Sequence, residues 1–194
     1  MFPLPLRYAL RAFRTSLPAF LIGTGLLLSS PIRAQGPIER AVGGFLSNGA
    51  YFFTASSGRE ALGSVQFYNE TEIYARPLRI GDRLELSGGI QIATVNDRFF
   101  PFTGGNQFVL FGPALRITRP RVIGQLRPYF SAGLFVGNIR SDRIQRNVTD
   151  FTPGLSAGVE WPLTRFLTLS AGYRFVERIG GVDPSGFTLS LRIF

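Results

Sequence analysis

The sequence predicts an all-β protein: an eight-stranded antiparallel up-and-down transmembrane β-barrel. Three observations lead to this fold class. Apolar and polar residues alternate with a period of two, tight connections alternate with longer ones, and an apolar export signal precedes the alternating segments. Successive side chains of a strand point to opposite faces of the sheet, so each segment has one apolar and one polar face. Tight turns at one end and longer loops at the other are typical of outer-membrane barrels.

The N-terminal segment predicts export. Three arginines precede the run 17–30, which is apolar and uncharged, and Ala34 then offers a small residue before Gln35. This order is typical of a cleaved secretory signal peptide. The run has 14 residues, whereas a membrane-spanning helix needs ~20. We therefore expect a signal peptide over 1–34, used by the Sec route, and a barrel domain over 35–194.

The cysteine content and the net charge limit which anchors and which binding partners this protein can have. The chain has no cysteine, which excludes disulfides and a lipoprotein anchor. Its net charge is +9, carried by arginine without lysine, and four of those arginines belong to the expected signal peptide, leaving 9 − 4 = +5. The arginines are not clustered as in a nucleic-acid site, so we expect no nucleic acid partner. Outer-membrane lipid and lipopolysaccharide of a Gram-negative bacterium are the expected anionic partners.

Eight segments carry the alternation. The expected strands are 40–55, 63–77, 82–95, 107–119, 127–138, 152–162, 166–177 and 186–194. The first is the least regular, with a possible break at 47–49. The seventh is among the most regular, because Leu167 and Leu169 oppose Thr168 and Ser170.

The connections between these segments differ in length. The tight ones are 77–81 and 162–165, the longer ones are 96–106, 139–151 and 178–185, and the turn at 120–126 is the least regular. The tight turns are expected at the periplasmic end.

Alternation alone does not decide which face is inside, because a soluble lipocalin-like barrel has an apolar lumen. The polar face consists mostly of Gly, Ser, Thr and Ala, which suits a crowded lumen better than a water-facing surface. Aromatic residues near strand ends suggest the girdles of a membrane barrel. These are Phe52, Phe53, Tyr74, Phe108, Tyr129, Phe130, Trp161, Phe166 and Phe187. The sequence ends at Phe194, a terminal aromatic of the kind read by the barrel assembly machinery, although a bulge is needed to bring it into phase with the apolar face.

The polar face also carries charges of both signs. They are Glu70, Glu72, Arg76, Arg83, Glu85, Arg116, Glu160, Arg174 and Arg192. Buried charges need partners, so we expect a salt-bridge network in the lumen; a catalytic carboxylate or a proton path is the alternative. Eight strands enclose a lumen that side chains can fill, so no open pore is expected.

A second group of charges lies in the expected loop after the fifth strand. Arg140, Arg143 and Arg146 occur there, and arginine suits bidentate phosphate contacts. They are candidates for lipopolysaccharide phosphate contacts; an ordinary solvated loop is the alternative.

The sequence contains few candidate catalytic residues. Histidine and cysteine are absent, and a serine nucleophile needs an adjacent base. No metal cluster or phosphate-binding glycine loop is recognised, so no cofactor or metal is expected. Glu177, near the end of the seventh expected strand, is the one carboxylate that we consider for a catalytic role.

Two stretches resemble the lipid A deacylase (PagL, acyloxyacyl-hydrolase-like) family of outer-membrane β-barrels. The first is Arg127-Pro-Tyr-Phe-Ser-Ala-Gly-Leu-Phe-Val-Gly, and the second is Ala171-Gly-Tyr-Arg-Phe within the C-terminal segment 151–194. The resemblance implies an eight-stranded outer-membrane scaffold that acts on lipopolysaccharide acyl chains.

The chain departs from that family at the catalytic positions. The family carries a histidine and, two residues on, a serine at the outer end of the seventh strand, where this sequence has Phe175 and Glu177. Asp183 is the sole candidate for the family's supporting carboxylate. We therefore expect a non-enzymatic barrel, structural or interacting with lipid and lipopolysaccharide. The alternative is an acyl-ester hydrolase with an unrecognised catalytic constellation; the oligomeric state is left open.

Overall fold

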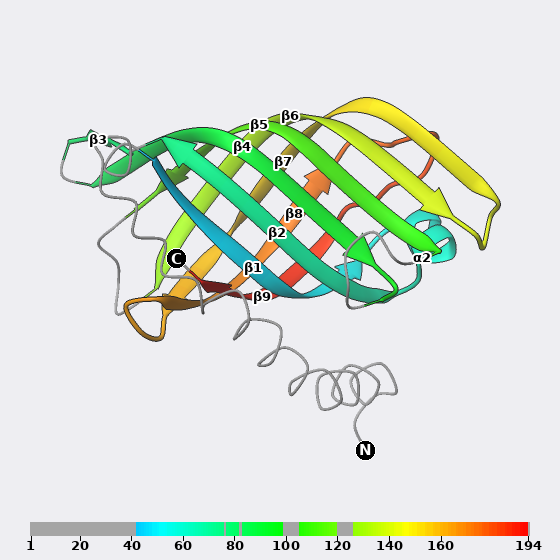
Figure 1. Cartoon of the computed structure of the whole chain (residues 1–194), viewed down its shortest axis with the longest axis horizontal. Coiled ribbons are helices and arrows are strands. Elements are labelled where there is room, and N and C mark those ends of the chain that lie inside the picture. The colour runs from blue at the N-terminus through cyan, green and yellow to red at the C-terminus, as the bar shows by residue number, and fades with distance from the viewer. Residues whose placement is uncertain (1–41, 76, 82, 99–104, 120–125, 194) are drawn as a thin grey trace, which may run out of the picture. The chain divides into compact units, whose positions relative to one another are not determined.

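A computed structural model describes residues 42–75, 77–81, 83–98, 105–119 and 126–193 (Figure 1). All of them belong to one compact unit, residues 40–194. The expected signal peptide and Phe194 lie outside the described residues.

Antiparallel strands that pair in chain order make up nearly the whole unit. They are β1 (Val42–Phe53), β2 (Val65–Ala75), β3 (Leu78–Ile80), β4 (Leu84–Asn96), β5 (Asn106–Thr118), β6 (Arg127–Ser141), β7 (Arg146–Pro162), β8 (Leu167–Val176) and β9 (Gly186–Ile193). β1 pairs with both β2 and β9, and β2 pairs with β4, so the sheet closes on itself. The three residues of β3 continue the ladder of β2 along β4. The predicted eight-stranded antiparallel barrel is confirmed.

The strands differ from the prediction mainly at β1 and at the β6–β7 hairpin. β1 is unbroken, since Ser47, Asn48 and Gly49 pair with β2 and with β9. β6 and β7 extend the expected strands to a turn at 142–145, so the expected loop 139–151 is mostly hairpin. Polar residues made this stretch look like a loop, but the side-chain amide of Asn138 bridges to the partner strand.

A short helix, α2 (Ser56–Leu62), lies in the connection between β1 and β2 and was not predicted. Seven residues are too few for a helical period to stand out in the sequence. The helix ends at Gly63, whose φ of 101° lies in the left-handed region that favours glycine. Its buried Ala61 and Leu62 pack into the apolar core rather than facing solvent.

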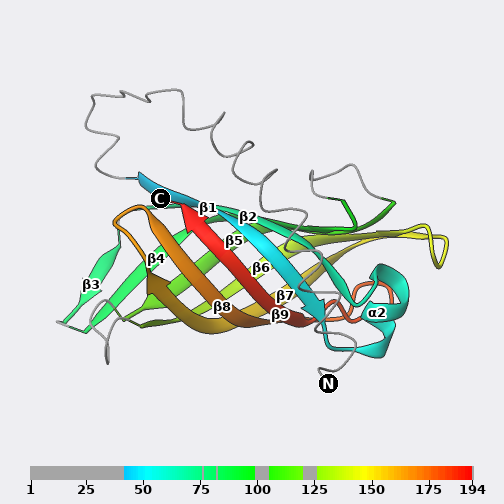
Figure 2. The same cartoon turned by 90° about the horizontal axis from the view of Figure 1, so that it is seen from below.

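The two ends of the barrel differ. The end that carries α2 and the connections β4–β5, β6–β7 and β8–β9 is called here the α2 end, and the opposite end, with the connections β3–β4, β5–β6 and β7–β8, the turn end (Figures 1 and 2). At the α2 end the lumen is filled by apolar side chains, among them Tyr51, Phe108, Ile139 and Ile179. The hydroxyl of Tyr51 donates to the Pro184 carbonyl at 2.8 Å and ties the β8–β9 connection to this plug.

The outer and inner faces have inverted polarity relative to a soluble barrel. Large apolar side chains such as Ile73, Leu115 and Leu134 point outward with 55%, 58% and 65% of their surface exposed. On the lumen side, Ser170 and Arg192 are buried.

The aromatic residues divide between these faces. Phe130, Trp161, Phe166 and Phe187 are exposed on the outside, as expected of a girdle. Phe53, Phe108 and Tyr129 were also assigned to the girdle, but they are buried. Their positions in the two-residue alternation place them on the lumen face, which proximity to a strand end does not reveal.

Candidate functional site

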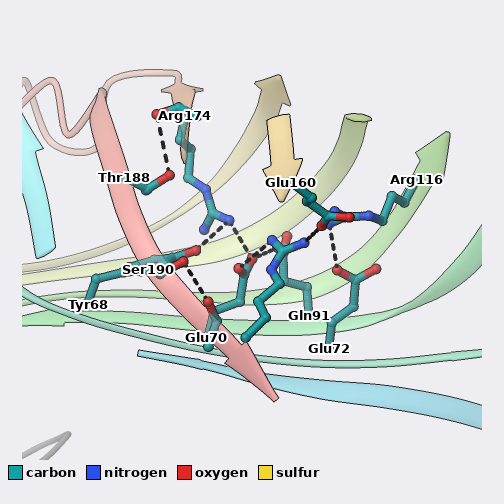
Figure 3. A network of polar contacts seen from close by, with 12 residues as sticks. Tyr68, Glu70, Glu72, Gln91, Arg116, Glu160, Arg174, Thr188 and Ser190 are labelled. Atoms are coloured by element: carbon teal, nitrogen blue, oxygen red, sulfur yellow. Dashed lines mark hydrogen bonds and ion pairs between the residues drawn. The ribbon is translucent and has the colours of Figure 1, made fainter. Parts of the chain in front are cut away.

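The lumen between the apolar plug and the turn end holds a network of ion pairs (Figure 3). Glu70 on β2 receives hydrogen bonds on one carboxylate oxygen from Arg174 on β8, at 2.6 Å, and from the side chain of Gln91. Its other oxygen lies 3.3 Å from an Nη of Arg192 on β9. The same Arg174 also donates to the hydroxyl of Tyr68 at 3.1 Å. Glu70 therefore connects β2 with β4, β8 and β9.

Arg192 continues the network toward a second carboxylate. Glu160 on β7 accepts hydrogen bonds from Arg192 and from Arg116 on β5. Arg116 in turn lies 3.5 Å from Glu72 on β2. Three carboxylates and three guanidinium groups thus alternate around the lumen, and their formal charges cancel.

Aromatic rings complete the surroundings of the two central arginines. The guanidinium of Arg116 lies 4.2 Å from the ring centre of Tyr129, and that of Arg192 lies 4.1 Å from the ring centre of Phe45. Cations over aromatic faces are attracted by the ring quadrupole. Tyr68, Gln91, Phe45 and Tyr129 were not predicted as members, although the two-residue alternation of their strands could have placed them on the lumen face.

Burial decides what this network can do. The six charged side chains are at most 9% exposed. A buried charge that loses its partner typically destabilises a protein by ~3–5 kcal/mol, so each member is held by the others. A cavity of about 10 Å³ beside Arg174, bordered by Gln91, Ser131 and Ser156, has room for one water molecule at most. The arrangement supports a structural core.

Two predicted members are not part of the network. Arg83 is exposed at the turn end, and Glu85 pairs instead with Arg79, at 3.6 Å. Both were expected in the lumen because they share a face with Ser87 and Gln91. The β3–β4 hairpin continues beyond the lumen, and all three residues of β3 are exposed. Arg76 lies outside the described residues.

The three loop arginines lie at the β6–β7 hairpin tip and have different surroundings. Arg140 is exposed on the outer face of β6, in phase with Val136. The guanidinium of Arg143 lies beside Gly63 at the end of α2. Arg146 donates to the carbonyl of Gly180 in the β8–β9 connection. Lipopolysaccharide phosphate contacts by these three arginines stay a prediction.

The positions that match the deacylase catalytic site lie on β8 and in the β8–β9 connection. Phe175 is 48% exposed on the outer face of β8, and the side chain of Glu177 is exposed just beyond that strand. The carboxylate of Asp183 accepts a hydrogen bond from the Ser185 N–H, at 3.0 Å, and orders the β8–β9 connection. No hydrogen bond or ion pair joins Phe175, Glu177 and Asp183.

Within the described ranges, no group of three or more acidic, histidine or cysteine side chains is arranged to hold a metal ion. No helix in the part of the chain that the structure describes is long and apolar enough to cross a membrane.

Comparison with known proteins gives structural similarities alone. No protein-family model matches the sequence, and no curated protein matches it. Neisserial surface protein A is similar, with a TM-score of 0.48 and 17% identity over 78% of this chain and 97% of that one. The outer membrane protein Ail of Yersinia pestis, in a phospholipid nanodisc, has a TM-score of 0.43 and 12% identity over 77% and 97%. A designed transmembrane β-barrel has a TM-score of 0.41 and 13% identity over 82% and 97%.

The fold class therefore rests on the molecule itself. A closed sheet, an apolar exterior and an ion-paired lumen define a small eight-stranded β-barrel of the outer-membrane type. The comparisons do not assign the chain to a family, and the resemblance to lipid A deacylases stays a prediction.

Proposed function

We propose that this protein is a non-enzymatic barrel of the bacterial outer membrane, with a structural or lipid-interacting role. The observation that carries the proposal is the inverted polarity of the barrel wall. Each of the eight long strands presents at least one exposed large apolar side chain to the outside, while ion pairs fill part of the inside. Soluble monomers rarely expose contiguous apolar surface on this scale. A closed sheet also leaves no unpaired edge in hydrocarbon.

The lumen supports a role other than passive diffusion. Apolar side chains fill it at the α2 end, and the network around Glu70 and Glu160 crosses it between these side chains and the turn end. We expect no ion-conducting steps when the purified protein is added to planar bilayers. Stable single-channel conductance would contradict a filled lumen.

The proposed absence of catalysis rests on the sequence. Histidine and cysteine are missing, and Phe175 and Glu177 stand where the deacylases carry histidine and serine. The proposed partners are outer-membrane lipid, including lipopolysaccharide, and the barrel assembly machinery that would read the strand ending at Phe194.

Membrane fractionation tests the proposed location. The protein should sediment with the outer membrane and should change its gel mobility on heating, because folded small barrels resist detergent unless boiled. A protein found in the soluble periplasmic fraction, with the same mobility before and after heating, would contradict the proposal.

A further inference from the structure

Exposed charge is distributed unevenly between the two ends of the barrel. Among the described residues at the turn end, the exposed arginines are Arg79, Arg83, Arg119, Arg127 and Arg165, which form the arginine rim. Among the described residues of that end, Glu85 is the single carboxylate, and it is half-buried. At the α2 end, six arginines (Arg59, Arg98, Arg140, Arg143, Arg146 and Arg178) face six carboxylates (Glu60, Asp97, Asp142, Asp150, Glu177 and Asp183). Within the described barrel, the excess positive charge therefore lies at the turn end.

The arginine rim alternates with exposed apolar side chains. Arg79 lies between Leu78 and Ile80, which are 68% and 52% exposed. These two residues pair with Leu86 and Leu84 on β4, so the β3–β4 hairpin has one apolar face that extends the outer face of the barrel.

The other two connections repeat this arrangement. Leu126, 43% exposed, precedes Arg127. Phe166, 54% exposed, follows Arg165, whose guanidinium lies 4.4 Å from the centre of its ring. At each of the three connections at this end, the described residues thus include a cation next to a large apolar group in the sequence.

We infer that the arginine rim binds the phosphate groups of anionic phospholipids in the leaflet that surrounds the turn end. This inference rests on the proposed function, because it requires the barrel to lie in a bilayer. Guanidinium groups form bidentate contacts with phosphate. Apolar and basic side chains side by side suit the boundary between acyl chains and headgroups, where long basic side chains keep their charge in water.

The exposed apolar side chains beside the rim arginines favour lipid over other anionic partners. A water-soluble polyanion would pair with the arginines but would leave Leu78, Ile80 and Phe166 in water. Tight turns of outer-membrane barrels face the periplasm, so the ligand would come from the phospholipid leaflet on that side. The three loop arginines Arg140, Arg143 and Arg146 lie at the opposite, charge-balanced end.

The sole tryptophan is a natural reporter for this inference. Trp161 is 47% exposed on the outer face of β7, near its turn-end terminus. Its neighbour Glu160 pairs with Arg127 in the β6–β7 ladder, and Arg165 lies in the turn that follows. Lipids with brominated acyl chains quench tryptophan on contact, so the identity of the lipid around Trp161 can be measured.

The experiment uses protein expressed from its full-length sequence, purified in detergent and reconstituted into phosphatidylcholine–phosphatidylglycerol vesicles. One lipid or the other is brominated, at equal mole fraction. Both leaflets have the same composition, so the direction of insertion does not matter. We expect brominated phosphatidylglycerol to quench as if bound about fivefold more tightly than brominated phosphatidylcholine, the factor that one arginine near an anionic surface supplies.

Matched variants separate the rim from general charge. In the Arg127→Gln/Arg165→Gln variant the lipid preference should fall to about one. The control Arg140→Gln/Arg143→Gln removes the same charge from the α2 end and should keep the preference of the parent protein. Heat-modifiable mobility checks that each variant is folded. If the rim variant does not fold, salt provides the second measure: about 0.5 M NaCl should lower the preference of the parent protein.

The outcomes distinguish the two proposals. Equal quenching by both lipids in the parent protein would overturn the inference. So would a preference that survives the rim substitutions, one that is lost in the α2-end control, or one that salt leaves unchanged. If neither brominated lipid quenches Trp161, the barrel does not lie in the bilayer and the proposed function itself fails.

Discussion

Replacing Glu70 with glutamine probes the lumen network at its most connected carboxylate. The substitution keeps the shape of the side chain but removes its charge and turns one acceptor oxygen into an N–H donor. That oxygen position faces the guanidinium of either Arg174 or Arg192, both of which can only donate. The lumen then holds three arginines and two carboxylates, and at least one cation loses its partner.

The expected cost follows from burial. The side chains of Glu70, Arg174 and Arg192 are 1%, 7% and 3% exposed, so the free energy of unfolding should fall by about 3–5 kcal/mol. Glu85→Gln is the matched control, because its partner Arg79 is 82% exposed and the two atoms are 3.6 Å apart. An exposed pair of this kind contributes about 0–1 kcal/mol.

Denaturant unfolding from lipid vesicles, followed by Trp161 fluorescence, measures both variants. A second readout is the double variant Glu70→Gln/Arg174→Gln, which restores equal numbers of positive and negative charges. Its loss of stability should be smaller than the sum of the two single losses, because the residues share one network. If Glu70→Gln lies within about 1 kcal/mol of the parent protein, or if the two changes are additive, the reasoning about the lumen is refuted.

Three further predictions concern the wall, the N-terminus and activity. Leu169→Arg on the outer face of β8 should reduce folding into bilayers by about 2–4 kcal/mol, whereas Ser170→Asn on the lumen face should do much less if the larger amide can be accommodated; equal effects in vesicle refolding would contradict the assigned faces. The membrane-extracted protein should begin at Gln35 in an intact-mass measurement, and a species that retains 1–34 would exclude signal cleavage there. Mass spectrometry of lipid A from expressing cells should show no lost acyl chain; a loss abolished by Glu177→Ala would instead support the hydrolase alternative.

Side-chain alternation made the barrel and much of its lumen predictable. A strand assigns each residue to one of two faces, so Glu70, Arg174 and Arg192 could be placed inside without knowledge of the strand pairing. Pairing then brings distant positions together. Glu70 and Arg192 lie 122 residues apart in the chain, but their strands, β2 and β9, are the two neighbours of β1 in the sheet.

The errors arise where alternation continues beyond the lumen or is interrupted. Arg83 and Glu85 follow the inward phase of β4, but Arg83 is exposed and the Glu85 side chain is 26% exposed, whereas the charged side chains of the network are at most 9% exposed. The two-residue alternation tells which face a residue is on, but not where along the barrel axis it lies. The helix α2 depends on contacts made by Ala61 and Leu62 with the apolar plug, and these contacts come from segments far apart in the sequence.

The charge difference between the ends also required the structure. The rim arginines come from three different connections between strands, so no single stretch of the sequence contains all of them. Closure of the sheet brings the connections that carry them to one end of the barrel.

Refolding with and without lipid tests most directly whether the apolar face is the outer face. The denatured protein is diluted either into phosphatidylcholine vesicles or into plain buffer, and β-structure is followed by circular dichroism together with heat-modifiable mobility. We predict a folded, heat-modifiable barrel in vesicles and aggregated or unfolded protein in buffer, because outward residues such as Leu115 and Leu134 need hydrocarbon around them. A monomeric protein with native β-structure in plain buffer would contradict the membrane barrel.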